Sequence, residues 1–177
     1  MCTTVFLNYI STITLKGKKV LELGCGSGII SIYTASKGAS VTASDINKIA
    51  LDSLKSVSQK QHFDINCIYS DLFKATPKIC FDCIIINPPY YPRRAKSIEE
   101  HAWFCGKDFE YFEKLFIQLP NQLTSTTNCL MILSDDCEIK TIKNTAKKNN
   151  LSFTKIHEKQ SLFEKNYIYK IEITTFN

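Results

Sequence analysis

The sequence predicts an α/β fold in which a mostly parallel sheet ends in an antiparallel hairpin. From residue 18 onward, short β-branched runs alternate with amphipathic helical stretches, which is the pattern of a parallel sheet covered by helices. The last two strand-like runs, residues 151–158 and 166–175, have no helix between them and must therefore pair antiparallel. The chain has 177 residues, so we expect residues 1–177 to form one domain.

Five further runs are predicted to be strands because they are short, apolar and rich in β-branched residues. They are residues 20–23, 40–44, 65–69, 83–86 and 130–133. Together with the hairpin they predict a sheet of seven strands.

Helical stretches lie between these strands, and three of them show apolar residues at three- and four-residue spacing. Such spacing predicts one buried face per helix. Pro120 is expected to interrupt or bend the second of them, and the third is expected to end near Asn149 and Asn150. The predicted faces are Ile46, Ala50, Leu54 and Val57; Phe109, Phe112, Leu115, Phe116 and Leu119; and Ile139, Ile142 and Ala146.

The composition is that of an ordinary globular protein, with 44% apolar and 22% charged residues. No stretch approaches the roughly 18 apolar residues that span a bilayer, and residues 1–4 carry no positive charge before a short apolar run, so a cytoplasmic location is expected. The net charge of +5 favours an anionic partner without requiring one, because the lysines are spread along the chain.

The eight cysteines lack the dense spacing of a secreted disulfide scaffold, and we expect them to be reduced and buried. Cys80 and Cys83 form one C-x-x-C, which could begin a zinc site with His101 and Cys105. A structural zinc site usually has a second closely spaced pair, so packing is the favoured interpretation and no metal is expected.

The most specific local pattern is Glu22-Leu23-Gly24-Cys25-Gly26-Ser27-Gly28, between the first strand and the first helix that follows it. Alternate glycines let the backbone turn sharply with no Cβ in the way, so a ligand can lie against the main chain. A dinucleotide loop reads G-x-G-x-x-G, whereas here the third glycine comes one position early and Ile29 takes its place. The loop therefore favours a ligand without a pyrophosphate, and a dehydrogenase is disfavoured.

Acidic residues follow the next two strands. Asp45 ends the second strand at a spacing from Gly24 that lets a carboxylate reach the hydroxyls of a ribose. Asp71, in the run Ser70-Asp71-Leu72-Phe73 after the third strand, is placed to accept from the exocyclic amine of an adenine. Taken alone, Asp45 could be a helix cap and Asp71 a turn residue. Both follow strand carboxyl ends, however, and open α/β sheets bind ligands at these ends. Together with the glycine loop, the two residues predict a nucleoside cofactor site.

The fourth strand ends in Asn87-Pro88-Pro89-Tyr90. Because a residue before proline is restricted to extended geometry, Asn87 is held at the strand end with its side chain presented to the cleft. The Asn87 amide oxygen and the Pro88 carbonyl are two acceptors that can converge on one planar amino group, and Tyr90 can stack on its face. Such acceptors suit the methylation of a poorly nucleophilic nitrogen, because both hydrogen bonds strengthen as the nitrogen gains positive charge.

This combination resembles class I S-adenosylmethionine-dependent methyltransferases with an N-P-P-Y motif, namely the release-factor glutamine methyltransferases and the small methyltransferase-domain proteins. The resemblance implies a Rossmann-like, doubly wound sheet, the cofactor S-adenosyl-L-methionine with the product S-adenosyl-L-homocysteine, and a target group contacted by Asn87, Pro88 and Tyr90. It implies a cofactor site formed by Glu22, Gly24, Gly26, Gly28, Asp45, Ile46, Asp71, Leu72 and Asn87.

The chain departs from the bacterial release-factor enzymes in two places. Those enzymes carry an N-terminal helical domain that helps to dock the substrate, whereas here only residues 1–17 precede the first strand, so docking is expected to work otherwise. Residues 105–109 resemble only loosely the Gly-Gly-x-Asp-Gly stretch that follows N-P-P-Y in those enzymes.

Two kinds of substrate therefore stay open as the acceptor of the methyl group. They are a protein glutamine and the amino group of an RNA or DNA base. Arg93, Arg94 and Lys96 follow Tyr90, where they could hold the phosphates of a flipped base, form a solvated lid or meet an acidic protein surface. A binding module that kept the fold without catalysis is a further alternative, and the intact N-P-P-Y argues against it. We expect a macromolecular partner, protein or RNA, and no membrane association.

Overall fold

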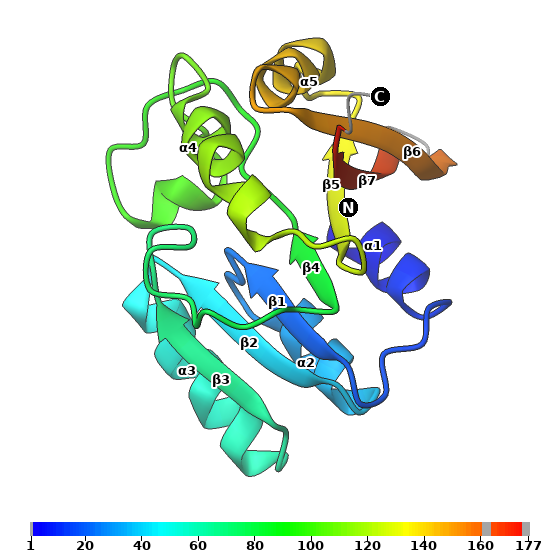
Figure 1. Cartoon of the computed structure of the whole chain (residues 1–177). Coiled ribbons are helices and arrows are strands. Elements are labelled where there is room, and N and C mark those ends of the chain that lie inside the picture. The colour runs from blue at the N-terminus through cyan, green and yellow to red at the C-terminus, as the bar shows by residue number, and fades with distance from the viewer. Residues whose placement is uncertain (1, 161–163, 175–177) are drawn as a thin grey trace.

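The computed structural model describes residues 2–160 and 164–174, which form one seven-stranded sheet between two layers of helices (Figure 1). The strand order is β3-β2-β1-β4-β5-β7-β6. The first five strands pair in parallel, whereas β7 pairs antiparallel with both β5 and β6. The strands are β1 (Lys19–Leu23), β2 (Ser40–Asp45), β3 (Ile65–Tyr69), β4 (Cys83–Ile86), β5 (Asn128–Ser134), β6 (Leu151–Gln160) and β7 (Lys165–Ile173).

This architecture confirms the predicted fold class, a Rossmann-like, mostly parallel sheet with a C-terminal antiparallel hairpin. The predicted bounds of β3 and β4 are those observed, and the other strands differ from prediction by one or two residues at an end. Residue 175, which was assigned to the last strand, lies outside the described residues.

Helices cover both faces of the sheet, and alternate residues of each strand face alternate layers. In β4, Ile84 and Ile86 belong to the core beneath α4 and α5, whereas Cys83 and Ile85 belong to the core beneath α1 and α2 (Figure 1). The helices are α1 (Cys2–Ile10), α2 (Ile29–Ser36), α3 (Lys48–Lys60), α4 (Glu110–Gln118) and α5 (Ile139–Lys148), with short 3-10 turns η1 (Glu99–Ala102) and η2 (Leu119–Gln122).

The predicted face of α3 was wrong in part. Asn47 caps this helix, because its side chain accepts from the backbone N–H groups of Ile49 and Ala50. Ile46 therefore precedes the helix. Leu54 is buried as predicted, whereas Leu51 and Ser58 are buried in place of their half-buried neighbours Ala50 and Val57.

The other predicted faces hold for α4 and α5, except that Phe109 and Ile139 are only partly buried. Phe112, Leu115, Phe116, Ile142 and Ala146 are fully buried. Phe109 precedes α4 as a residue with φ of 62°, and η2 begins where Pro120 was expected to interrupt the helix.

All eight cysteines are free, and six are buried, but Cys80 is exposed, which corrects the expectation that all of them are buried. Among the described residues, no group of three or more His, Cys, Asp or Glu side chains is arranged to hold a metal ion. No helix in the same residues is long and apolar enough to cross a membrane.

Candidate active site

A cavity of about 640 Å³ lies at the carboxyl ends of the parallel strands. Its walls include the segments that follow β1, β2, β3 and β4. The strand order reverses between β1 and β4, because β2 and β3 lie on one side of β1 and β4 lies on the other. Open α/β sheets bind ligands at such a point. The cavity brings together eight of the predicted site residues, which are Glu22, Gly24, Gly26, Asp45, Ile46, Asp71, Leu72 and Asn87.

The glycine loop forms one wall as a backbone cradle. Gly24 and Gly26 have φ of 72° and 49°, and a Cβ built on either would meet nothing within 4 Å. Their missing side chains therefore leave open space beside the main chain. Gly28 does not line the cavity, because it is buried against α3, and its Cβ would lie 2.5 Å from Leu54 Cδ1. Only the first two glycines leave room for a ligand.

Asp45 holds the glycine loop from the end of β2. Its Oδ2 accepts from the backbone N–H of Gly26 at 2.8 Å, and its Oδ1 accepts from the backbone N–H of Asn47 at 2.8 Å. A carboxylate offers about four acceptor sites, so two hydrogen bonds leave capacity for the hydroxyls of a ligand. Asp45 therefore shapes the loop, and its role in binding a ribose stays a prediction.

Glu22 lies beneath the same loop and is only 2% exposed. Its carboxyl group is hydrogen-bonded to the hydroxyl of Ser31 on α2. Burial raises the pKa of Glu22 to about 8, although the Ser31 hydrogen bond opposes that shift. Burial therefore favours the protonated, uncharged form of the Glu22 carboxyl group.

The segment after β3 forms the third wall. Ser70 Oγ donates to the carbonyl of Leu72 at 2.7 Å and accepts from the N–H of Ala75 at 3.0 Å, which closes a tight turn in which Leu72 has φ of 52°. The turn leaves the side chain of Asp71 at the cavity, where it pairs with Lys74 at 2.6 Å. The Asp71 carboxylate is exposed, so this ion pair contributes little to stability.

Asn87 and Pro89 line the cavity at the end of β4, whereas Pro88 and Tyr90 do not. Pro88 is buried, and the Tyr90 ring packs against both core layers. Burial raises the pKa of Tyr90. The roles predicted for the Pro88 carbonyl, as a hydrogen-bond acceptor, and for the Tyr90 ring, as a stacking surface, stay predictions.

Several cavity residues were not assigned to the site from the sequence. Thr3 contributes from α1 and Tyr111 from α4, and the segment from Arg94 to Gly106 covers one side. Desolvation of the hydroxyl and the negative charge of Asp45 raise the pKa of Tyr111. Apart from Arg94, which belongs to the basic run noted after Tyr90, no local pattern marks these positions, because tertiary packing brings them to the cavity.

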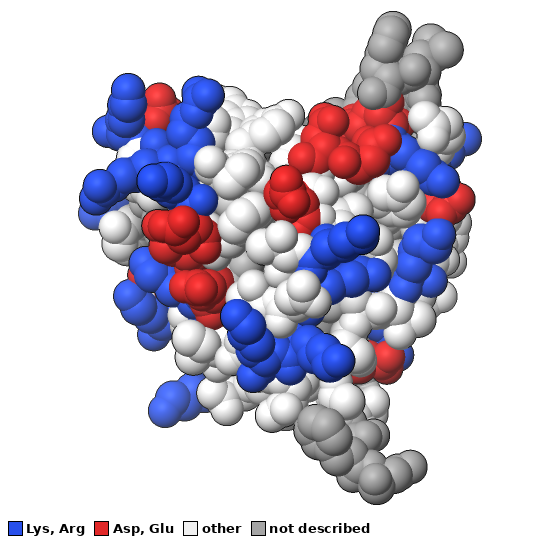
Figure 2. All heavy atoms as spheres, turned by 90° about the horizontal axis from the view of Figure 1, so that it is seen from above, with Lys and Arg blue, Asp and Glu red and all other residues white. Residues whose placement is uncertain are grey.

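Charged groups of both signs surround the cavity. Glu22, Asp45 and Asp71 come from the strand ends and the turn after β3. The covering loop and α4 contribute two basic residues and two acidic ones, which are Arg94, Lys114, Glu99 and Glu110. Figure 2 looks down on the carboxyl edge of the sheet and shows acidic and basic side chains interleaved across it. The acidic groups and the open backbone cradle fit a cofactor with cationic centres and a ribose.

Comparison with known proteins gives a family match. Residues 1–104 match the methyltransferase small domain family. A Methanocaldococcus jannaschii protein, provisionally named a protein N5-glutamine methyltransferase, is 38% identical over 118 residues, which are 63% of this chain and 59% of that protein. The Haemophilus influenzae ribosomal RNA small subunit methyltransferase C is 30% identical over 143 residues, which are 74% of this chain and 43% of that enzyme. The chain thus spans only part of the length of both relatives.

Solved structures share the fold. The E. cuniculi Mtq2-Trm112 complex, described as responsible for methylation of the eRF1 translation termination factor, matches with a TM-score of 0.72 and 20% identity over 98% of this chain and 95% of that one. A Pyrococcus furiosus methyltransferase matches with a TM-score of 0.71 and 19% identity over 94% of this chain and 81% of that one.

Proposed function

The chain belongs to the methyltransferase small domain family, and on that premise we propose that it methylates a planar nitrogen, the side-chain amide of a protein glutamine. Its cofactor is S-adenosylmethionine. The observation that carries the proposal is the position of Asn87, which shares one cavity with the glycine loop, Asp45 and Asp71. A target nitrogen held by Asn87 is therefore beside the cofactor site.

The residues of the chain supply binding, orientation and charge stabilisation. When bound, S-adenosylmethionine supplies an electrophilic methyl group. In this proposal Asn87 Oδ1, which lies at the cavity, accepts from one N–H bond of a planar amide. The carbonyl of Pro88, a residue that does not itself line the cavity, is the proposed second acceptor. Preorganised acceptors of this kind stabilise the positive charge that develops on the nitrogen, which lowers the barrier without a covalent intermediate.

Three observations favour a protein acceptor over a nucleic acid. The cavity wall carries acidic as well as basic groups, and the carboxyl face shows no continuous basic surface (Figure 2). A phosphate backbone binds best to clustered Lys and Arg. In addition, the M. jannaschii relative and the E. cuniculi complex carry names that refer to glutamine or termination-factor methylation.

An RNA base is the second candidate, and two observations support it. Arg94 and Lys114 line the cavity where the acceptor would enter, and the H. influenzae relative is named as a ribosomal RNA enzyme. A flipped base would present its exocyclic amine to Asn87 in the same way as an amide.

The test is transfer of labelled methyl from S-adenosylmethionine into fractionated cell extract. We expect a labelled macromolecule that is sensitive to protease, resistant to nuclease, and yields N5-methylglutamine on complete enzymatic digestion. Label that is removed by nuclease and recovered as a methylated base would contradict the protein acceptor and support the second candidate. Label on oxygen or carbon would contradict both.

A further inference from the structure

The N-terminal helix α1 reaches the acceptor side of the cavity. Thr3, in its first turn, lines the cavity next to Asn87. Asn87 Nδ2 donates to Thr3 Oγ1 at 3.3 Å, and this is the only side-chain hydrogen bond that Asn87 makes within residues 2–160 and 164–174. The two residues are 84 positions apart, so this contact is a product of the fold.

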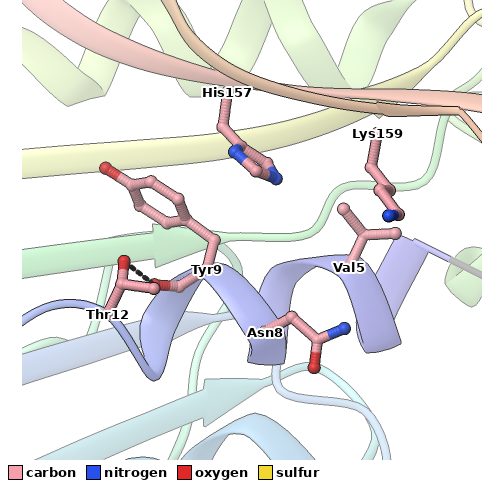
Figure 3. A pocket seen from close by; sticks show the side chains of 6 residues that line it. All are labelled: Val5, Asn8, Tyr9, Thr12, His157 and Lys159. Atoms are coloured by element: carbon pink, nitrogen blue, oxygen red, sulfur yellow. Dashed lines mark hydrogen bonds between the residues drawn. The ribbon is translucent and has the colours of Figure 1, made fainter.

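Helix α1 is held firmly enough to place Thr3. Next to Thr3, the buried Cys2 thiol donates to Asn166 Oδ1 of β7 at 2.7 Å, and Phe6 and Ile10 are fully buried. At the other end, the Tyr9 ring packs on His157 of β6 with centroids 5.5 Å apart (Figure 3). Contacts with both hairpin strands therefore fix the start and the end of the helix.

The Thr3 contact has a chemical consequence for Asn87. A side-chain amide has one donor end and one acceptor end, and it is useful to a substrate N–H only when its oxygen faces that group. With Nδ2 directed at Thr3, Oδ1 is the end that is left to accept from another molecule. If the Asn87 side-chain amide were rotated by about 180°, its Nδ2 would face the target nitrogen, and the N–H groups of Asn87 and of the target would repel each other.

We propose that Thr3 is a positioning residue, whose hydroxyl holds the Asn87 amide with its oxygen toward the target nitrogen. This inference rests on the proposed function, because it concerns the acceptor role of Asn87. It assigns to α1 a part in catalysis in addition to its part in the core.

The matched variants are Thr3→Val, which keeps the shape but removes the hydroxyl, Thr3→Ser, which keeps the hydroxyl, and Thr4→Val. Thr4 is the exposed neighbour on the same helix and serves as the control. Because one neutral hydrogen bond is lost, we expect Thr3→Val to lower the rate of labelled methyl transfer to extract about 3- to 10-fold. Thr3→Ser and Thr4→Val should stay within about 2-fold of wild type, since neither loses the hydrogen bond.

Two further readouts separate positioning from other roles. The side-chain ¹⁵N resonance of Asn87, assigned by its loss in Asn87→Ala, should shift in Thr3→Val and not in Thr4→Val. In the Asn87→Ala background, Thr3→Val should lower kcat no further, because residues that act through one another are not additive. The affinity for S-adenosylhomocysteine should be unchanged by Thr3→Val in calorimetry.

Three results would overturn the inference. Wild-type turnover in a folded Thr3→Val variant, a full additional loss in the Asn87→Ala background, or a tenfold loss of S-adenosylhomocysteine affinity would each show that Thr3 does not act through Asn87. The proposed function would survive these results as long as Asn87→Ala alone abolishes transfer to nitrogen. If Asn87→Ala is itself fully active, both proposals fail.

Discussion

At the residue scale, the carboxyl groups around the glycine loop have two kinds of partner. Asp45 bonds two backbone N–H groups and faces the cavity, whereas Glu22 is buried beneath the loop against Ser31. The sequence predicted the position of both, because each stands at or near a strand end. The burial of Glu22 and the second bond of Asp45 depend on how α2 and the loop pack, and no local pattern predicts them.

Replacing Asp45 with Ala should weaken binding of S-adenosylhomocysteine by about 1.5–3 kcal/mol, since hydrogen bonds to a charged group are lost. Calorimetry checks this. Asp82→Ala is a matched control, because Asp82 also accepts from a backbone N–H, that of Lys19 at 2.8 Å, but lies at the opposite edge of the sheet. Equal affinities in the two variants would remove Asp45 from the site.

Glu22 should make stability depend on pH. The pKa of Glu22 is about 8 in the folded chain and about 4.5 when the chain is unfolded, so folding favours the protonated form. Its contribution is fully present below about pH 4.5 and is lost as the pH rises to about 8. Glu22→Gln keeps the shape and removes the charge.

Chemical denaturation without cofactor should therefore show the wild type losing stability relative to Glu22→Gln between pH 5 and 8.5, by an amount on the order of a few kcal/mol. A difference between the two proteins that stays constant over this range would mean that Glu22 does not titrate there.

At the element scale, strands were predicted more accurately than helices. The runs that form β3 and β4 are short, apolar and bounded by polar residues, so their ends are well marked. Helix α1 was not predicted, because it has only nine residues, no acidic residue in its first turn and no basic residue in its last turn. The spacing of Phe6 and Ile10, four positions apart and fully buried, was the available signal.

The packing of the glycine loop on α3 predicts unequal effects of two glycine substitutions. Gly17 and Gly28 both have φ of 72°, but a Cβ on Gly17 meets nothing within 4 Å, whereas one on Gly28 lies 2.5 Å from Leu54 Cδ1. Gly17→Ala should lower the free energy of unfolding by about 1–2 kcal/mol, the cost of the left-handed conformation. Gly28→Ala should cost about 1–3 kcal/mol more, because the side chain also overpacks.

Urea denaturation of the two variants measures this difference directly. Equal losses would show that α3 gives way without cost and that Gly28 is needed only for its backbone conformation.

At the scale of the whole molecule, the fold brings distant segments into one cavity. The strand order places the ends of β1 and β4 side by side, so the glycine loop and Asn87 meet although they are far apart in sequence. This juxtaposition was predictable, because parallel strands end at the same edge of a sheet. The positions of Thr3, Tyr111 and the segment from Arg94 to Gly106 were not, because they depend on how α1, α4 and a long loop fold back over that edge.

The central claim is that Asn87 holds the nitrogen that receives the methyl group, and Asn87→Ala tests it most directly. This substitution removes one acceptor and leaves the cradle formed by Gly24, Gly26 and Asp45 in place. The measurement is single-turnover transfer of the labelled methyl group to the acceptor, together with calorimetric binding of S-adenosylhomocysteine. We predict cofactor affinity within about 2-fold of wild type, since the cradle is intact, and a rate lower by about 100- to 1000-fold, as when one preorganised acceptor is lost. A wild-type rate in Asn87→Ala would contradict the claim.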